Sequence, residues 1–212
     1  MRRIIEKHKL HWSKKSFTWS TALGFTLLAL SLFVNYFANI YTTSRASNAV
    51  TDIILDNIPV YNVNFIFLDG FAIFWAFVIF LMVLYPQKMP FTVKSIAAFI
   101  LIRSIFISLT HLGIPPNHSF LEQSDALHYT TSGNDMFFSS HTGLPFLMSL
   151  VFWNNKKLRY IFIGVSLFFG VSVLLGHLHY SIDVFAAFFI TYGIFHISRE
   201  LFRKDYELAE EV

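Results

Sequence analysis

Long apolar segments constrain the fold of this 212-residue chain more than any other feature of its sequence. Apolar residues make up 55% of the chain and charged residues only 14%, a balance that excludes a soluble globular domain. A helix needs about 20 apolar residues to cross the hydrocarbon core of a bilayer, where the backbone must satisfy its own hydrogen bonds. The five clearest runs are residues 19–41, 63–85, 92–112, 160–176 and 180–202.

A sixth apolar run, residues 136–153, is shorter and contains Pro145. We expect it to begin at the membrane surface, with the end that carries His141 held against protein rather than lipid. The polar residues 42–62 should form an exposed loop with a short amphipathic turn. The sequence therefore predicts an all-α fold, a polytopic membrane protein built as a six-transmembrane-helix bundle.

The chain divides into three parts by charge and hydropathy. Residues 1–18 are a basic N-terminus, residues 19–202 form the six-helix membrane domain, and residues 203–212 are a C-terminal tail. The first run is longer than the apolar part of a signal peptide, so we interpret it as an uncleaved anchor, although the small residues at 44–49 leave cleavage open. The acidic residues 207–212 are most simply a solvated end.

The distribution of Lys and Arg predicts the orientation in the membrane. Six of these residues precede the first run, two lie between the second run and the first residues of the third, three follow the short run and three lie at the end of the last run and beyond it, so 14 of 16 share one side. Only Arg45 falls on the other side, and only Arg103 lies deep within a span. Because Lys and Arg concentrate in cytoplasmic loops, we predict that both termini are cytoplasmic. His141, His179 and Asp183 then face away from the cytoplasm.

Cysteine is absent, which excludes disulfides, a thiolate metal site and a cysteine nucleophile. Other histidines, at 111, 118, 128 and 177, fall on the same side as His141 and His179, but their spacing matches no compact metal-binding motif. We expect no metal, no other cofactor and no nucleic-acid partner. The expected partners are the bilayer and its lipids.

His179 and Asp183 are the clearest candidate pair for chemistry. A separation of four residues stacks two side chains on one face of a helix, so the carboxylate can accept a hydrogen bond from one ring nitrogen. That contact fixes the tautomer and leaves the other nitrogen as a base or nucleophile. His177, two residues from His179, should point away from it.

The second candidate element is the start of the short run, Ser139-Ser140-His141. Serine is a favoured N-cap, and a helix N-terminus offers unpaired N–H groups and a positive dipole end to an anion. The sequence therefore predicts a phosphate-sized anion at this helix start.

These two motifs resemble those of the type 2 phosphatidic acid phosphatase superfamily, and within it the sphingomyelin synthase branch. That branch carries Asp-x-x-x-Ser-Gly-His-Thr followed by His-Tyr-Thr-Ile-Asp. The residues that match are Asp135, Ser139, His141, Thr142, His179, Tyr180, Ile182 and Asp183. Ser140 stands where the family has Gly, and Gly133-Asn134 where sphingomyelin synthases have Cys-Gly. The likeness covers roughly residues 63–202.

The stretch before the motifs also resembles this branch. Arg103 to Thr110 and Leu112 to Pro115 are similar to its Arg-x6-Thr-x-Leu-Pro, with two residues inserted before the proline. The Lys-x6-Arg-Pro and Ser-Arg signatures of the ordinary phosphatases are absent.

The resemblance implies metal-free chemistry on a lipid phosphoester. His179 would be the nucleophile, Asp183 would orient it, and His141 would be the general acid and base. The expected substrate-binding set is Arg103, Asp135, Ser139, Ser140 and Tyr180. Arg103 lies about ten residues into its span, so pairing with Asp69 of the preceding span is the alternative to a role at the phosphate.

The reaction class stays open between transferase and hydrolase. The resemblance implies transfer of a phospho-head group from a glycerophospholipid to a lipid alcohol through a phosphohistidine. A lipid phosphatase or a phospholipase C-type hydrolase would share the covalent step. A non-enzymatic carrier of metal or lipid is the less favoured alternative, because the predicted spans hold few charged residues.

Overall fold

The computed structural model describes residues 2–119 and 136–211, and in that part of the chain every regular element is helical. The longer helices are α1 (Arg2–Trp12), α2 (Lys15–Arg45), α3 (Phe71–Leu84), α4 (Met89–Leu109), α6 (Ser140–Val151), α7 (Lys156–Leu175), α8 (Ser181–Leu201) and α9 (Arg203–Glu210). Three short turns complete the set: the 3-10 turns η1 (Leu55–Asn57) and η3 (Pro86–Lys88), and the π-helical turn η2 (Ile66–Gly70), which leads into α3.

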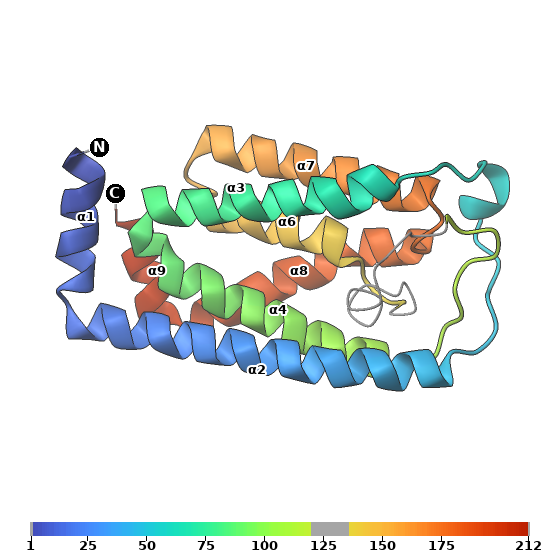
Figure 1. The fold of residues 1–212 in the computed structure, drawn as a ribbon, viewed down its shortest axis with the longest axis horizontal. Coiled ribbons are helices and arrows are strands. Elements are labelled where there is room, and N and C mark those ends of the chain that lie inside the picture. The colour runs from blue at the N-terminus through green and yellow to red at the C-terminus, as the bar shows by residue number, and fades with distance from the viewer. Residues whose placement is uncertain (1, 120–135, 212) are drawn as a thin grey trace.

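The long helices lie roughly along one axis, with α2 beside α4 and with α6 enclosed by its neighbours (Figure 1). Helix α1 runs across the end of the bundle that holds both termini. Helices α6 and α8 begin toward the opposite end. We call the end with the termini the tail end and the opposite end the site end.

Five helical segments are long and apolar enough to cross a bilayer, which agrees with the predicted helical membrane bundle. They are Lys15–Arg45, Ile66–Leu84, Pro86–Leu109, Lys156–Leu175 and Ser181–Leu201. The sixth predicted span differs: α6 has 12 residues and is about 18 Å long, well short of the roughly 30 Å hydrocarbon core. Ten of its residues are buried, so it lies inside the bundle rather than against lipid.

The chain before α6, residues 136–139, bends and contacts α4. The Thr110 hydroxyl donates to the Met136 carbonyl at 3.3 Å, and Arg103 Nε donates to the Phe138 carbonyl at 3.2 Å. Helix α6 thus begins level with Arg103, about 9 Å along α4 from its end at Leu109.

The middle of the bundle is closely packed around Gly143 of α6. A Cβ atom at this position would lie 2.7 Å from the Phe99 ring of α4 and 2.8 Å from Thr191 Oγ1 of α8. The absence of a side chain therefore sets how closely α6 approaches both helices. Phe99, Phe138 and Leu147 are fully buried around it.

The tail end is fastened by ion pairs. Lys94 of α4 is buried and contacts Asp205 of α9 at 2.6 Å, and Ser20 of α2 donates to the same carboxylate at 2.5 Å. Lys88 contacts Glu210 at 3.2 Å, and Asn154 also donates to Glu210. The interpretation of residues 207–212 as only a solvated end is therefore wrong for Glu210.

The loop after α2 folds over the site end instead of standing free. Ser47 N donates to the His111 carbonyl at 2.8 Å, and Gly113 N donates to the Asn48 carbonyl at 3.2 Å. The predicted short turn is η1, whose Leu55 is buried. We call residues 46–62 the cover loop.

Candidate active site

The first turns of α6 and α8 lie against each other at the centre of the candidate site. Ser139 is the N-cap residue of α6, and its backbone N–H donates to the Asp183 carbonyl in the first turn of α8 at 3.0 Å. This hydrogen bond joins two residues that are 44 positions apart in the sequence. Two helix N-termini, each with a positive dipole end, therefore meet at one place.

The His179–Asp183 pair forms as its spacing predicts. His179 Nδ1 lies 3.2 Å from Asp183 Oδ2, and both residues are buried. Since a carboxylate only accepts, Nδ1 is the donor in this contact, and Nε2 is the ring nitrogen left for chemistry. Helix α8 begins at Ser181, so His179 precedes the helix, and Asp183 reaches back over its N-terminus to accept from Tyr180 N at 3.1 Å.

Two oxygen atoms at this junction are buried and have no hydrogen-bond partner in the described part of the chain. They are Asp183 Oδ1 and Ser139 Oγ, on residues that are 1% and 0% exposed. Leaving a buried polar atom unpaired costs about 1–3 kcal/mol, and more for a charged group. Such atoms are rare in native proteins, and a ligand that pairs with them is one explanation for their presence.

His141 lies in the first turn of α6, where its ring is held by the π-helical turn η2. Its Nε2 donates to the Phe67 carbonyl at 3.2 Å. The ring stacks on Phe67 at 3.8 Å and contacts Phe71 at 4.0 Å between ring centroids. The imidazole is thereby fixed in orientation and largely removed from solvent. No sequence pattern predicts this contact, because Phe67 lies in an apolar run of uniform character.

Arg103 contacts the chain that leads into α6 and is not paired with Asp69. It is 5% exposed, and its Nε–H bond to Phe138 places the guanidinium one residue from Ser139. Asp69 is exposed on η2, and no ion pair joins these two described residues. The alternative of an Arg103–Asp69 pair is therefore wrong.

The remaining predicted binding residues have different positions. Ser140 is the first residue of α6 and is partly buried. Tyr180 is the N-cap residue of α8; its hydroxyl donates to the Gly113 carbonyl at 2.9 Å and accepts from Val50 N at 3.2 Å. The proton of this hydroxyl is thus bonded to Gly113, while its oxygen holds the cover loop at Val50. Asp135 lies outside the described residues.

Within residues 2–119 and 136–211, no group of three His, Asp or Glu side chains could hold a metal ion.

Residues 132–200, about a third of the chain, match the family model described as PAP2 superfamily C-terminal. Comparison with curated proteins gives no significant match, and neither does comparison with solved structures. The matched region contains His141, His179 and Asp183. Members of this superfamily typically act on phosphoesters, so the match indicates an enzyme of the lipid phosphatase or phosphotransferase type.

Proposed function

We propose that this protein is a sphingomyelin-synthase-like lipid phosphotransferase, which moves a phospho-head group from a glycerophospholipid to a lipid alcohol. The observation that carries the proposal is the buried His179–Asp183 pair at the meeting point of two helix N-termini, with Arg103 bonded to Phe138 just before one of them. This arrangement combines a nucleophile of fixed tautomer with positive dipole ends for a phosphate. The choice of lipid substrates rests on the resemblance of the paired motifs to those of sphingomyelin synthases.

In the first step, His179 Nε2 attacks the phosphorus atom and the bond from phosphorus to the diacylglycerol oxygen breaks. His141 gives a proton to that oxygen, so diacylglycerol leaves as a neutral alcohol. In the second step, His141 takes the proton of the acceptor hydroxyl, whose oxygen attacks phosphorus and breaks the P–N bond. Asp183 holds His179 in place and stabilises the positive charge on its ring.

The donor would be a phosphodiester, which carries one negative charge at the phosphate. Arg103 and the N-terminus of α6 at Ser139 and Ser140 supply about the positive charge that such a group needs. A phosphomonoester dianion calls for more cations, and the chain lacks the two basic signatures of the ordinary phosphatases. These considerations favour cleavage of a diester.

A hydrolase is the second candidate, because water in place of the acceptor alcohol gives the same first step. It is favoured by Ser140, which stands where the family has Gly at the phosphate-binding turn. A carrier of metal or lipid is less favoured, since the His179–Asp183 geometry is that of a positioned nucleophile.

The test is to incubate the purified protein with labelled phosphatidylcholine, phosphatidylethanolamine and phosphatidic acid, each with and without ceramide or diacylglycerol. A new phospho-head-group lipid that appears only with an acceptor is the expected result. Release of inorganic phosphate from phosphatidic acid, with both diesters untouched, would show a phosphatase instead.

The orientation in the membrane is also a proposal: the site end faces away from the cytoplasm and both termini face it. The Lys and Arg distribution supports it. Since the chain has no native Cys, single cysteines at exposed Thr51 on the cover loop and Lys157 at the opposite end can be labelled from either side of intact cells or vesicles. Labelling of Thr51→Cys from the cytoplasmic side alone would refute this orientation.

A further inference from the structure

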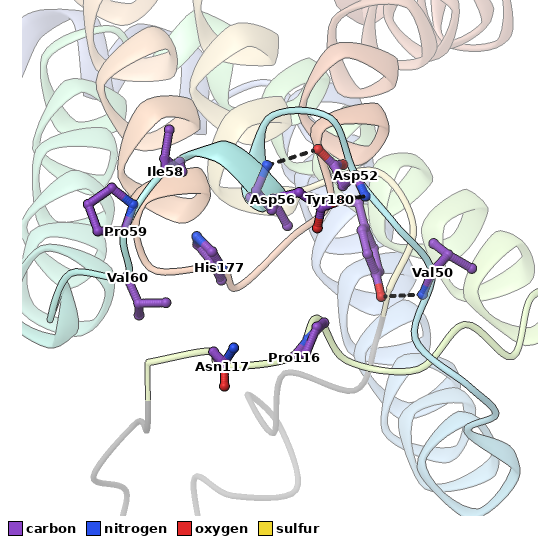
Figure 2. A pocket seen from close by; sticks show the side chains of 11 residues that line it. Val50, Asp52, Asp56, Ile58, Pro59, Val60, Pro116, Asn117, His177 and Tyr180 are labelled. Atoms are coloured by element: carbon purple, nitrogen blue, oxygen red, sulfur yellow. Dashed lines mark hydrogen bonds between the residues drawn. The ribbon is translucent and has the colours of Figure 1, made fainter.

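A cavity of about 400 Å³ adjoins the start of α8, and the proposed reaction steps do not use it. Its walls come from the cover loop, from Pro116 and Asn117, and from the turn that contains His177 and Tyr180 (Figure 2). His179 does not line it, although it lies between those last two residues in the sequence. The cavity therefore adjoins the short turn that carries His179, one residue away along the chain.

His177 is the residue that marks this cavity as a binding site. It is 5% exposed, and its Nε2 is buried with no hydrogen-bond partner among the described residues. Figure 2 places its ring among the lining residues, between the cover loop and Asn117. Its backbone is left-handed, with φ of 51°, a conformation that few side chains adopt. A buried ring nitrogen held in this way is a hydrogen-bonding group that lacks a partner.

The charge of the cavity is negative. Asp52 and Asp56 line it, and none of its described lining residues is Lys or Arg. The Asp52 oxygens already accept from Ser181 N, Ile54 N and Leu55 N. Asp56 is exposed and accepts only one bond in the described part of the chain, from Asp52 N at 3.2 Å, so its carboxylate is available to a ligand.

We propose that this cavity binds a primary ammonium group, with Asp56 as its counter-charge and His177 Nε2 as an acceptor of one N–H. A primary ammonium has three N–H donors, so it can donate to both of these acceptors. A quaternary ammonium has none, and is usually held by several aromatic faces. The only aromatic carbocycle among the described lining residues is that of Tyr180.

The position of the cavity suggests where such a group would come from. Tyr180 lines the cavity and directly follows His179, so the two Cα atoms are about 3.8 Å apart. A phosphodiester at His179 would place the end of its head group near this turn. Resting on the proposed function, the inference is that the donor lipid carries an aminoethyl head group, as in phosphatidylethanolamine, in preference to a choline head group.

The experiment uses the full chain in detergent micelles and has two arms. The first measures kcat/KM with phosphatidylethanolamine and phosphatidylcholine in the presence of acceptor. The second measures binding of ethanolamine and of choline by calorimetry. Both compare the wild type with Asp56→Asn and His177→Asn, where Asn tolerates the left-handed backbone. Asp69→Asn is the matched control, an exposed carboxylate on η2 that does not line the cavity.

We expect at least a tenfold preference for phosphatidylethanolamine, reduced by about tenfold or more in Asp56→Asn and left unchanged in Asp69→Asn; a tenfold ratio corresponds to about 1.4 kcal/mol. A preference for phosphatidylcholine, or a ratio that Asp56→Asn does not change, would overturn the inference. If no lipid is turned over, the proposed function fails and the second arm decides. Ethanolamine binding lost in Asp56→Asn would then support a site for free amines, and absence of binding would refute it.

Discussion

The two ends of the bundle treat buried charge in opposite ways. At the tail end, the buried Lys94 contacts Asp205 at 2.6 Å, and the Ser20 hydroxyl of a third helix donates a hydrogen bond to the same carboxylate. At the site end, buried Asp183 uses one oxygen for His179 and Tyr180 N, while its other oxygen has no partner among the described residues.

This difference indicates that the paired charges of the tail end stabilise the fold, whereas the unpaired atom of the site end belongs to a binding or catalytic site. A buried charge with a full set of partners holds helices together, and removing one partner destabilises the fold. A buried polar atom without a partner lowers stability, and such sites are expected where binding or chemistry requires them. Equivalent substitutions at the two ends should therefore have opposite consequences, and four predictions follow from the largest expected effect to the smallest.

Asp183→Asn and His179→Ala should each lower activity by about a thousandfold or more with little change in stability. The asparagine oxygen can still accept from Tyr180 N, but it no longer stabilises a cationic His179. Turnover of the labelled diester and thermal unfolding should be measured on the same samples. His196→Ala, near the C-terminal end of the same helix and far from its first turn, is the control and should keep full activity. Strong activity in His179→Ala would contradict the mechanism.

Asp205→Ala should have the reverse profile, with a loss of about 3–5 kcal/mol of unfolding free energy, because it leaves Lys94 buried without a counter-charge. Unfolding in mixed micelles of increasing dodecyl sulfate fraction measures the loss. Glu207→Ala is the matched control: its pair with Arg203 is exposed, and its removal should cost less than about 1 kcal/mol. Equal losses in both variants would show that Lys94–Asp205 does not fasten α9.

Gly143→Ala should lower both the stability and the activity of the protein. Its new methyl group would overlap Phe99 and Thr191, and overpacking of this kind costs about 1–3 kcal/mol. Since His141 is two residues away on the same helix, activity should fall as well. Gly164→Ala in α7 is the control, because nothing lies within 4 Å of its Cβ position, and it should stabilise the helix by up to about 1 kcal/mol. A Gly143→Ala protein of unchanged stability and activity would refute the close packing of α6.

Local patterns in the sequence predicted part of this arrangement. Apolar length located five helices to within a few residues, and the spacing of four predicted the His179–Asp183 contact. Serine before an apolar run predicted the N-cap residue of α6. Each of these features depends on residues close together in the chain, where helix geometry relates spacing to contact.

Contacts between distant segments were not predictable in the same way. Nothing in the sequence signals that His141 bonds to the Phe67 carbonyl, that α6 begins at the depth of Arg103, or that Asp205 pairs with Lys94. A backbone carbonyl carries no side-chain signature. The partner of a charge depends on how helices pack, which a single apolar run does not specify.

The smallest effect concerns Asp52, which fastens the cover loop to the start of α8. Burial raises the pKa of its carboxyl, but hydrogen bonds from Ser181, Ile54 and Leu55 outweigh burial and hold the pKa below its usual value. A lowered pKa means that ionised Asp52 stabilises the folded loop fully above the usual Asp pKa of about 4. This stabilisation is lost as the pH falls through the lowered value.

Hydrogen exchange of the cover loop should therefore be slow and nearly independent of this group at pH 5–8, once corrected for the intrinsic rate, and should become a few-fold faster below about pH 4. In Asp52→Asn the loop should exchange faster at neutral pH, and this added acid sensitivity should disappear, because the amide does not ionise. The helices at the tail end serve as an internal reference. If wild type and Asp52→Asn gain the same acid sensitivity in the cover loop, a different carboxylate holds it, and the site end is fastened by groups other than Asp52.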